Sequence, residues 1–299
     1  MYSKERITVD NSGIMRHTWT PDGEPVLILQ ICHGMAEHLS RYDELAQYLC
    51  GRGIMVCGID HPGHGESDGI RGHFGNKQGL QHLIGSNIRC AEDVKAAHPG
   101  VKYVIMGHSM GSFIARYIAG YHPDTADAYI FMGTAGHNGA VGAGKALASL
   151  ISVLGGRDKP SPFIAGISTG AYAKNPGYKT EFDWLSTDER EVKKYIDDEQ
   201  CGFCFTAAGY KTMFTMLQAI DPKGWAAKLD KHKPYFIPSG ADDPVGDFGK
   251  GVMQVYDAMT AAGCDNVTYK LYQGGRHEIL NDTVRDEVKS DIAEWLERI

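Results

Sequence analysis

Short, almost continuous apolar runs alternate with helix-forming segments through the first half of the chain. The apolar runs are rich in β-branched residues and lie at residues 25–32, 54–59, 101–106 and 128–132. Strands have this composition when both of their faces are covered, as in a parallel sheet. The helix-forming segments lie at residues 41–50, 79–97 and 112–119. This alternation predicts a doubly wound α/β fold, with a mostly parallel central sheet flanked by helices.

The alternation stops after residue 133 and resumes near residue 234. Glycine-rich turns and helix-like segments fill the interval, without a convincing strand. Beyond it, the pattern predicts strands at 234–238 and 267–272, and helices at 250–262 and 283–298. We therefore expect one α/β core, made of residues 1–133 and 226–299. A helical cap of residues 134–225 interrupts this core.

The bulk composition restricts the partners and the location. A net charge of −7 argues against a nucleic-acid partner, which favours a basic face. The N-terminus has no apolar signal region, and no apolar run reaches the roughly 18 residues that span a membrane. Seven scattered cysteines in such a chain predict reduced thiols and a cytoplasmic protein.

The sequence Gly107-His108-Ser109-Met110-Gly111 matches the pattern G-x-S-x-G. Chance matches are common in a chain with 37 glycines, and a serine can simply cap a helix. Here, however, a predicted strand precedes the motif and a predicted helix follows it. On such a turn the serine hydroxyl is held above the sheet, and helix N–H groups face a developing oxyanion. We therefore predict Ser109 to be a nucleophile.

An acid and a base are expected on loops after the last two predicted strands, in the order Ser, Asp, His. Asp242 and Asp243 follow residues 234–238, and His277 follows residues 267–272. Asp243 is favoured as the acid because it precedes a proline and so lies at an extended turn; Asp242 is the alternative. His277 would accept the serine proton, and the carboxylate would orient the imidazole.

The pair His33-Gly34 directly follows the strand predicted at residues 25–32. A turn at this point supplies one oxyanion donor, so the backbone N–H groups of Met35 and Met110 are the predicted pair. A zinc site on His33 and His38 is the competing interpretation. It lacks a third ligand with typical zinc spacing.

Five segments resemble the monoacylglycerol lipase and lysophospholipase-like group of α/β-hydrolases. They read HGMAEHLSRYDELAQYL, DHPGHGESDG, GHSMGS, GADDPV and GGRHE. The resemblance implies an α/β-hydrolase fold and an esterase that cleaves single-chain acyl esters. It also implies catalytic roles for Ser109, Asp243 and His277, and oxyanion roles for Met35 and Met110. By the same resemblance, Glu37 and Arg41 match positions near the polar end of the substrate site.

Apolar stretches at residues 146–154 and 213–217 lie within the predicted cap. They predict either an acyl pocket, lined by Met213, Phe214 and Met216, or a surface for transient contact with a membrane or micelle. The competing interpretation is that they pack the cap onto the core. Cys201 and Cys204 form a C-x-x-C outside any thioredoxin-like context, and we interpret them as cap packing.

The combined prediction is a serine carboxylic-ester hydrolase that acts on small acyl esters such as monoacylglycerols or lysophospholipids. The reaction would pass through an acyl-enzyme on Ser109 and would require no metal and no organic cofactor. One alternative is an acyltransferase or thioesterase with the same triad. An alternative of another class is a non-catalytic binding or redox module.

Overall fold

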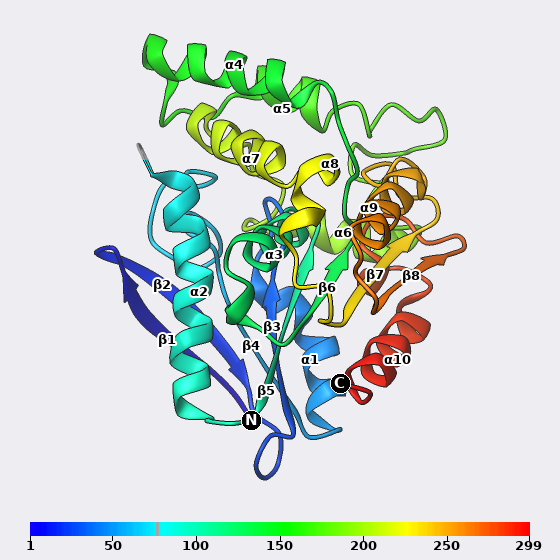
Figure 1. Cartoon of the computed structure of the whole chain (residues 1–299). Coiled ribbons are helices and arrows are strands. Elements are labelled where there is room, and N and C mark those ends of the chain that lie inside the picture. Colours follow the sequence, from blue (N-terminus) through cyan, green and yellow to red (C-terminus); the bar gives the residue numbers. More distant parts are fainter. Residues whose placement is uncertain (76–77) are drawn as a thin grey trace.

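One eight-stranded sheet forms the centre of the computed structural model, which describes residues 1–75 and 78–299 (Figure 1). Within these residues the strands are β1 (Tyr2–Val9), β2 (Ser12–Trp19), β3 (Leu27–Cys32), β4 (Ile54–Ile59), β5 (Lys102–His108), β6 (Ala128–Met132), β7 (Tyr235–Gly240) and β8 (Val267–Tyr272). Their order across the sheet is β1-β2-β4-β3-β5-β6-β7-β8. All neighbours from β4 to β8 are parallel, so the predicted mostly parallel sheet is confirmed.

The first two strands are an antiparallel hairpin that the apolar pattern did not predict. β1 pairs with β2, and β2 pairs antiparallel with β4. The turn between them is Asp10-Asn11, and both residues have positive φ angles of 49° and 63°. Asx residues tolerate this left-handed conformation, which two-residue hairpin turns require. β1 is an exposed edge strand of mainly polar residues, so it contains no apolar run.

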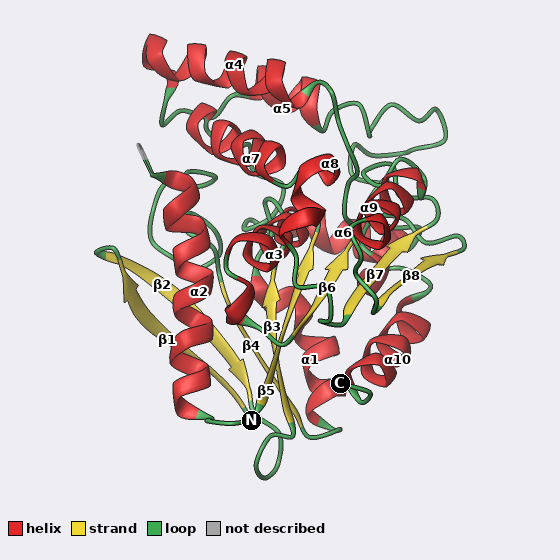
Figure 2. Cartoon of the chain, in the orientation of Figure 1, coloured by secondary structure: helices red, strands yellow, loops and turns green. Residues whose placement is uncertain are grey.

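Helices cover both faces of the sheet (Figure 2). Side chains such as Leu29, Val104 and Ile130 pack in one buried cluster with α1 (Asp43–Cys50) and α10 (Arg285–Leu296). Strand residues on the opposite face, such as Ile28, Ile105 and Phe131, pack in a second cluster. The helices that contribute to it from the core are α2 (Gly79–Ala97), α3 (Met110–Tyr121) and α9 (Lys250–Ala261). No helix of the described chain is long and apolar enough to cross a membrane.

Residues 134–225, which we call the cap segment, lie beyond the carboxyl ends of the parallel strands (Figure 1). The helices described in the cap segment are α4 (Val141–Ile151), α5 (Pro162–Ser168), α6 (Glu189–Asp197), α7 (Ala207–Ala219) and α8 (Pro222–Trp225). Apart from one isolated bridge between Pro160 and Thr206, no β pairing is found among its described residues. The division of the chain into a core and a cap stays a prediction.

The cap segment is hydrogen-bonded to two loops at the carboxyl edge of the sheet. On the loop after β3, the Ala36 carbonyl accepts from the Tyr195 hydroxyl at 3.0 Å and from the Gly202 N–H at 2.9 Å. On the loop after β8, the N–H of Glu278 donates to the Leu185 carbonyl at 2.7 Å. These bonds place the cap segment directly over the ends of β3 and β8.

Candidate active site

Ser109 occupies the sharp turn between β5 and α3. Its φ and ψ angles are 53° and −121°, in a region that non-glycine residues avoid. The chain packs closely here: a Cβ on Gly111 would lie 1.9 Å from the Cys32 carbonyl oxygen. A Cβ on Gly107 would lie 2.0 Å from the Gly111 carbonyl oxygen. The two glycines therefore allow the tight turn that raises Ser109 above the sheet.

The side chains of His277 and Asp243 meet at the edge of the cavity that contains Ser109. Nδ1 of His277 lies 2.9 Å from Oδ2 of Asp243, and both side chains are buried. The second carboxylate oxygen accepts the Val245 N–H at 2.8 Å, which fixes the carboxylate plane. Asp242 is exposed, so the structure brings Asp243 and not Asp242 to the imidazole. Nε2 of His277 is buried and has no hydrogen-bond partner within the described residues.

The predicted oxyanion donors lie beside Ser109. Met35 and Met110 both line the cavity that contains Ser109. A Cβ on Gly34 would come within 3.3 Å of the Ser109 Cβ, so the turn after β3 approaches the serine closely. Met110 is the first residue of α3, and the N–H groups of a first helical turn have no intrahelical acceptor. Both residues lie close to Ser109, and the role of their N–H groups as oxyanion donors stays a prediction.

Glu37 is the centre of a buried hydrogen-bond network under this turn. One carboxylate oxygen accepts from the Gly34 N–H, from the Tyr42 hydroxyl at 2.8 Å and from His108 Nδ1 at 3.3 Å. The other oxygen accepts from Arg41 at 2.6 Å. Arg41 in turn forms a bidentate pair with Glu278, with distances of 2.7 and 2.6 Å.

The roles expected for Glu37 and Arg41 near the polar end of the substrate site stay predictions. Glu37 lines the cavity with both carboxylate oxygens already bound by protein donors, whereas Arg41 does not line it. Their function in the structure is to hold the turn that carries Met35. Glu278, which completes the network, was missed in the sequence. Its position directly after His277 was the only available signal.

Charge pairing governs the ionisation of this network. Burial acts to raise the pKa of the Glu37 carboxyl, but the hydrogen bond from His108 and the charge of Arg41 outweigh it. The pKa of Glu37 is therefore held well below its usual range. Burial likewise acts to lower the pKa of the His108 imidazole, yet the hydrogen bond and charge of Glu37 raise it overall. Each partner therefore favours the charged form of the other.

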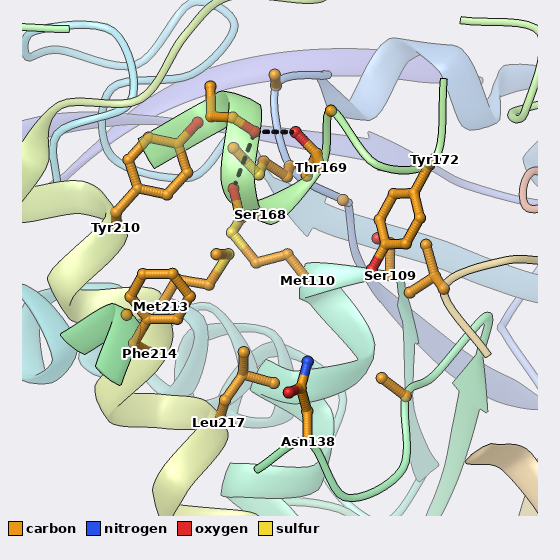
Figure 3. A pocket seen from close by; sticks show the side chains of 18 of the residues that line it. Ser109, Met110, Asn138, Ser168, Thr169, Tyr172, Tyr210, Met213, Phe214 and Leu217 are labelled. Carbon is orange, nitrogen blue, oxygen red and sulfur yellow. Dashed lines mark hydrogen bonds between the residues drawn. The ribbon is translucent and has the colours of Figure 1, made fainter. Parts of the chain in front are cut away.

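A cavity of about 1090 Å³ opens from Ser109 under the cap segment (Figure 3). Its walls beyond the serine are mainly apolar. Met213, Phe214 and Leu217 of α7 line it, together with small residues of α4. This volume is at the upper end of the range for small-molecule sites. Two of the three predicted acyl-pocket residues, Met213 and Phe214, therefore lie where the prediction placed them.

Met216 does not line the cavity, and this part of the prediction is wrong. Its side chain is completely buried in the hydrophobic core. Met213, Phe214 and Leu217 lie within about 100° of one another around the helix, whereas Met216 falls about 110° from the centre of that face. The apolar pattern alone did not distinguish the two faces.

The stretch at residues 146–154 also differs from the expected pocket lining. Of these residues only Leu147 lines the cavity. Leu150, Val153 and Leu154 are exposed, with Val153 and Leu154 more than three-quarters accessible. Phe163 of α5 is exposed as well, and none of these four residues lines the cavity.

The two histidines considered as a zinc pair have separate partners. His33 Nε2 accepts the His61 N–H at 2.9 Å, and the two imidazole rings are 3.9 Å apart. His38 instead pairs with Asp198 of the cap segment at 2.8 Å. Cys201 lies near this pair, and both Cys201 and Cys204 are free thiols.

Two aromatic residues of the cap segment lie in the site, although no sequence motif predicts them. The Trp184 ring lies 5.1 Å from the His277 ring, and the Tyr172 ring lies 5.2 Å from Trp184. All three residues line the cavity. Such residues could not be found from the sequence, because no local pattern marks the contact between a cap loop and the imidazole.

The parallel sheet, the strained serine turn and the buried Asp–His pair define the class of the α/β-hydrolases. The family model Hydrolase_4, described as serine aminopeptidase, S33, matches residues 23–284. The chain belongs to this family, and it is a serine hydrolase.

Similar proteins include enzymes named as lipases and esterases. A monoacylglycerol lipase of Mycolicibacterium smegmatis is 28% identical over 95% of this chain and 92% of its own length. The monoglyceride lipase of Homo sapiens is 27% identical over 97% of this chain and 88% of its own length. A thermostable carboxyl esterase from Bacillus coagulans, solved with glycerol, has a TM-score of 0.93 at 27% identity, covering 100% of this chain and 98% of its own. A soluble variant of the Saccharomyces cerevisiae monoglyceride lipase shares the fold, with a TM-score of 0.78 at 19% identity over 98% of this chain and 94% of its own.

Proposed function

We propose that the protein is a serine ester hydrolase that cleaves monoacylglycerols and related single-chain acyl esters. One observation carries this proposal: Ser109, on its strained turn, opens directly into a large apolar cavity that is also lined by His277, the partner of the buried Asp243. The named activities of the similar lipases and of the carboxyl esterase support the same chemistry.

The reaction is a two-step acyl transfer through Ser109. The Ser109 hydroxyl attacks the ester carbonyl and gives its proton to Nε2 of His277, whose positive charge Asp243 stabilises. The N–H groups of Met35 and Met110 stabilise the tetrahedral oxyanion. His277 then protonates the leaving alcohol, and the acyl group stays on Ser109. Water activated by His277 releases the fatty acid and restores the serine.

The apolar end of the cavity is the acyl site of this proposal. Met213, Phe214 and Leu217 form a wall of adaptable side chains, which suits a flexible hydrocarbon chain. Figure 3 shows these α7 side chains across the cavity from Ser109, with Met110 between them.

The outer side of the cap segment is the proposed contact with aggregated substrate. Leu150, Val153, Leu154 and Phe163 are all more than half exposed, and none of them lines the cavity. They belong to α4, to α5 and to the segment between these helices, which lie at the end of the molecule opposite the two termini (Figure 1). An exposed apolar patch of this kind marks an interaction surface. We propose that it makes a transient contact with a membrane or micelle that presents the ester. The unpaired cysteines fit a proposed cytoplasmic location.

The test is labelling of the pure protein with a fluorophosphonate probe, together with hydrolysis of a p-nitrophenyl ester series. We expect labelling of the wild-type protein, complete loss in Ser109→Ala, and an optimum at a medium or long acyl chain. Absence of labelling in a folded sample would contradict the proposed nucleophile. Equal rates from acetyl to long-chain esters would contradict the acyl site.

A further inference from the structure

The cavity wall beside His277 is built by aromatic residues of the cap segment. The Trp184 ring contacts the His277 ring in a tilted arrangement, and the Tyr172 ring contacts Trp184 in the same way, at 5.1 and 5.2 Å between centroids. The Trp184 carbonyl also accepts the His277 N–H at 3.4 Å. The ring contacts and this hydrogen bond therefore fix the position of the wall relative to the imidazole.

The reaction places a particular part of the substrate at this wall. His277 Nε2 must give its proton to the oxygen of the leaving alcohol, so the alcohol portion of the ester lies next to His277. The acyl chain extends in the other direction, toward Met213 and Phe214 on α7. Figure 3 shows this separation, with Tyr172 and Ser109 on one side of the cavity and the α7 side chains on the other.

The Tyr172 hydroxyl is suited to bind a polar group at this position. Its ring directs the hydroxyl end toward Ser109 (Figure 3). No described protein group is hydrogen-bonded to this hydroxyl, so it is free to bind a ligand. Burial, with a smaller contribution from the charge of Asp243, raises the pKa of Tyr172 to about 12. The hydroxyl therefore stays protonated at neutral pH, and it can both donate and accept.

We propose that Tyr172 is a specificity-determining residue, whose hydroxyl binds a free hydroxyl on the alcohol portion of the ester. The inference rests on the proposed ester hydrolysis and adds that the enzyme recognises the alcohol portion of the substrate. It follows that the enzyme distinguishes a polyol ester, such as an acylglycerol, from a simple alkyl ester with the same acyl chain. The acyl wall on α7 cannot make this distinction, because the acyl chains are identical.

The test compares two substrates, 1-decanoylglycerol and methyl decanoate, in wild-type protein and Tyr172→Phe. The variant keeps the ring and its contact with Trp184 and removes only the hydroxyl. We expect kcat/KM for the glycerol ester to fall about 3- to 10-fold, which corresponds to one hydrogen bond. The value for the methyl ester should change by less than about twofold, since methanol has no second hydroxyl. Fluorophosphonate labelling at the wild-type rate will verify that the variant is folded and its triad intact.

Tyr210→Phe is the matched control. Tyr210 lines the α7 side of the same cavity, so loss of its hydroxyl should leave the ratio between the two substrates unchanged. Equal losses of kcat/KM on both esters in Tyr172→Phe would overturn the proposal. They would indicate that the hydroxyl positions the water that hydrolyses the acyl-enzyme, a step that both substrates share. No change on either ester would overturn it as well. Failure of the wild-type protein to cleave both esters is a distinct result, because it refutes the proposed function itself.

Discussion

The His277 imidazole and the Asp243 carboxylate are joined by a 2.9 Å hydrogen bond, and both side chains are buried. The carboxylate is fixed from its other side by the Val245 N–H. Asp242, one residue earlier, is exposed and reaches the site only through its backbone N–H, which donates to the Gly275 carbonyl at 3.0 Å. Two neighbouring carboxylates of the same loop therefore have different environments.

This difference predicts that replacing Asp243 and replacing Asp242 will have different effects on kcat. In Asp243→Asn the amide no longer stabilises the imidazolium and favours the wrong tautomer, so kcat should fall by about 10⁴-fold. Asp242→Asn changes an exposed charge and should leave kcat within about twofold of wild type. Steady-state hydrolysis of one p-nitrophenyl ester measures both. Similar losses in the two variants would contradict the assignment of Asp243.

A second prediction concerns the turn around Ser109. A methyl group at Gly111 would collide with the Cys32 carbonyl oxygen, so Gly111→Ala should destabilise the protein by about 3 kcal/mol or more. Gly85 in α2 has open space around its Cα, so Gly85→Ala should stabilise by about 0.5–1 kcal/mol through helix propensity. Urea unfolding of the two variants gives the comparison. A stable Gly111→Ala variant would mean that the turn is looser than described.

A third prediction is a pH dependence of stability from the Glu37–His108 pair. The pKa of His108 is raised above its usual 6.5 in the folded protein. The stabilisation that comes from protonated His108 is therefore complete below pH 6.5 and is lost as the pH rises through the pKa of the folded state. The pKa of Glu37 is lowered below its usual 4.5, so its contribution is present above that pH and is lost as pH falls through the folded-state value. The pair should therefore stabilise most between pH 4.5 and 6.5.

The measurement is urea unfolding of wild type and His108→Gln from pH 5 to pH 9. At pH 6 the variant should be less stable by about 3 kcal/mol, because Glu37 loses a buried partner. The difference should shrink as the pH rises and the wild-type imidazole loses its proton. A difference that is constant across this range would show that His108 is neutral in the folded protein.

The sequence was sufficient for features that leave a local pattern. The buried strands β3 to β7 appear as apolar runs, and the order of Ser109, Asp243 and His277 follows from the loops after them. The hairpin of β1 and β2 was missed because an exposed edge strand needs no apolar run. Tyr172 and Trp184 were missed because their contacts with the site depend on how a loop folds over the sheet.

The sequence showed that the cap segment is rich in apolar residues, but it did not show which of these residues face the cavity. Met213 lines the cavity whereas Met216 is fully buried in the core, and this pair gives a fourth prediction. Met213→Trp should fill the acyl site and shift the p-nitrophenyl ester optimum toward shorter chains. Met216→Trp should overpack the core, costing about 1–3 kcal/mol of stability without changing the chain-length optimum. A shifted optimum in Met216→Trp would show that the two faces were wrongly assigned.

The last prediction concerns the exposed apolar residues on α4 and α5 and in the segment between them. Replacing Val153, Leu154 and Phe163 together by serine removes side chains that are 78%, 77% and 65% exposed, so folding should be little affected. Co-sedimentation with phosphatidylcholine vesicles that contain monoacylglycerol should fall by at least tenfold, because each buried side chain contributes about 1.5–3 kcal/mol. The control is Val26→Ser with Ile70→Ser, which removes exposed apolar side chains outside the cap segment. Hydrolysis of a water-soluble short-chain ester should be the same in all variants. If the control weakens vesicle binding as much as the cap variant, the contact is a general hydrophobic adsorption and the cap segment has no special part in it.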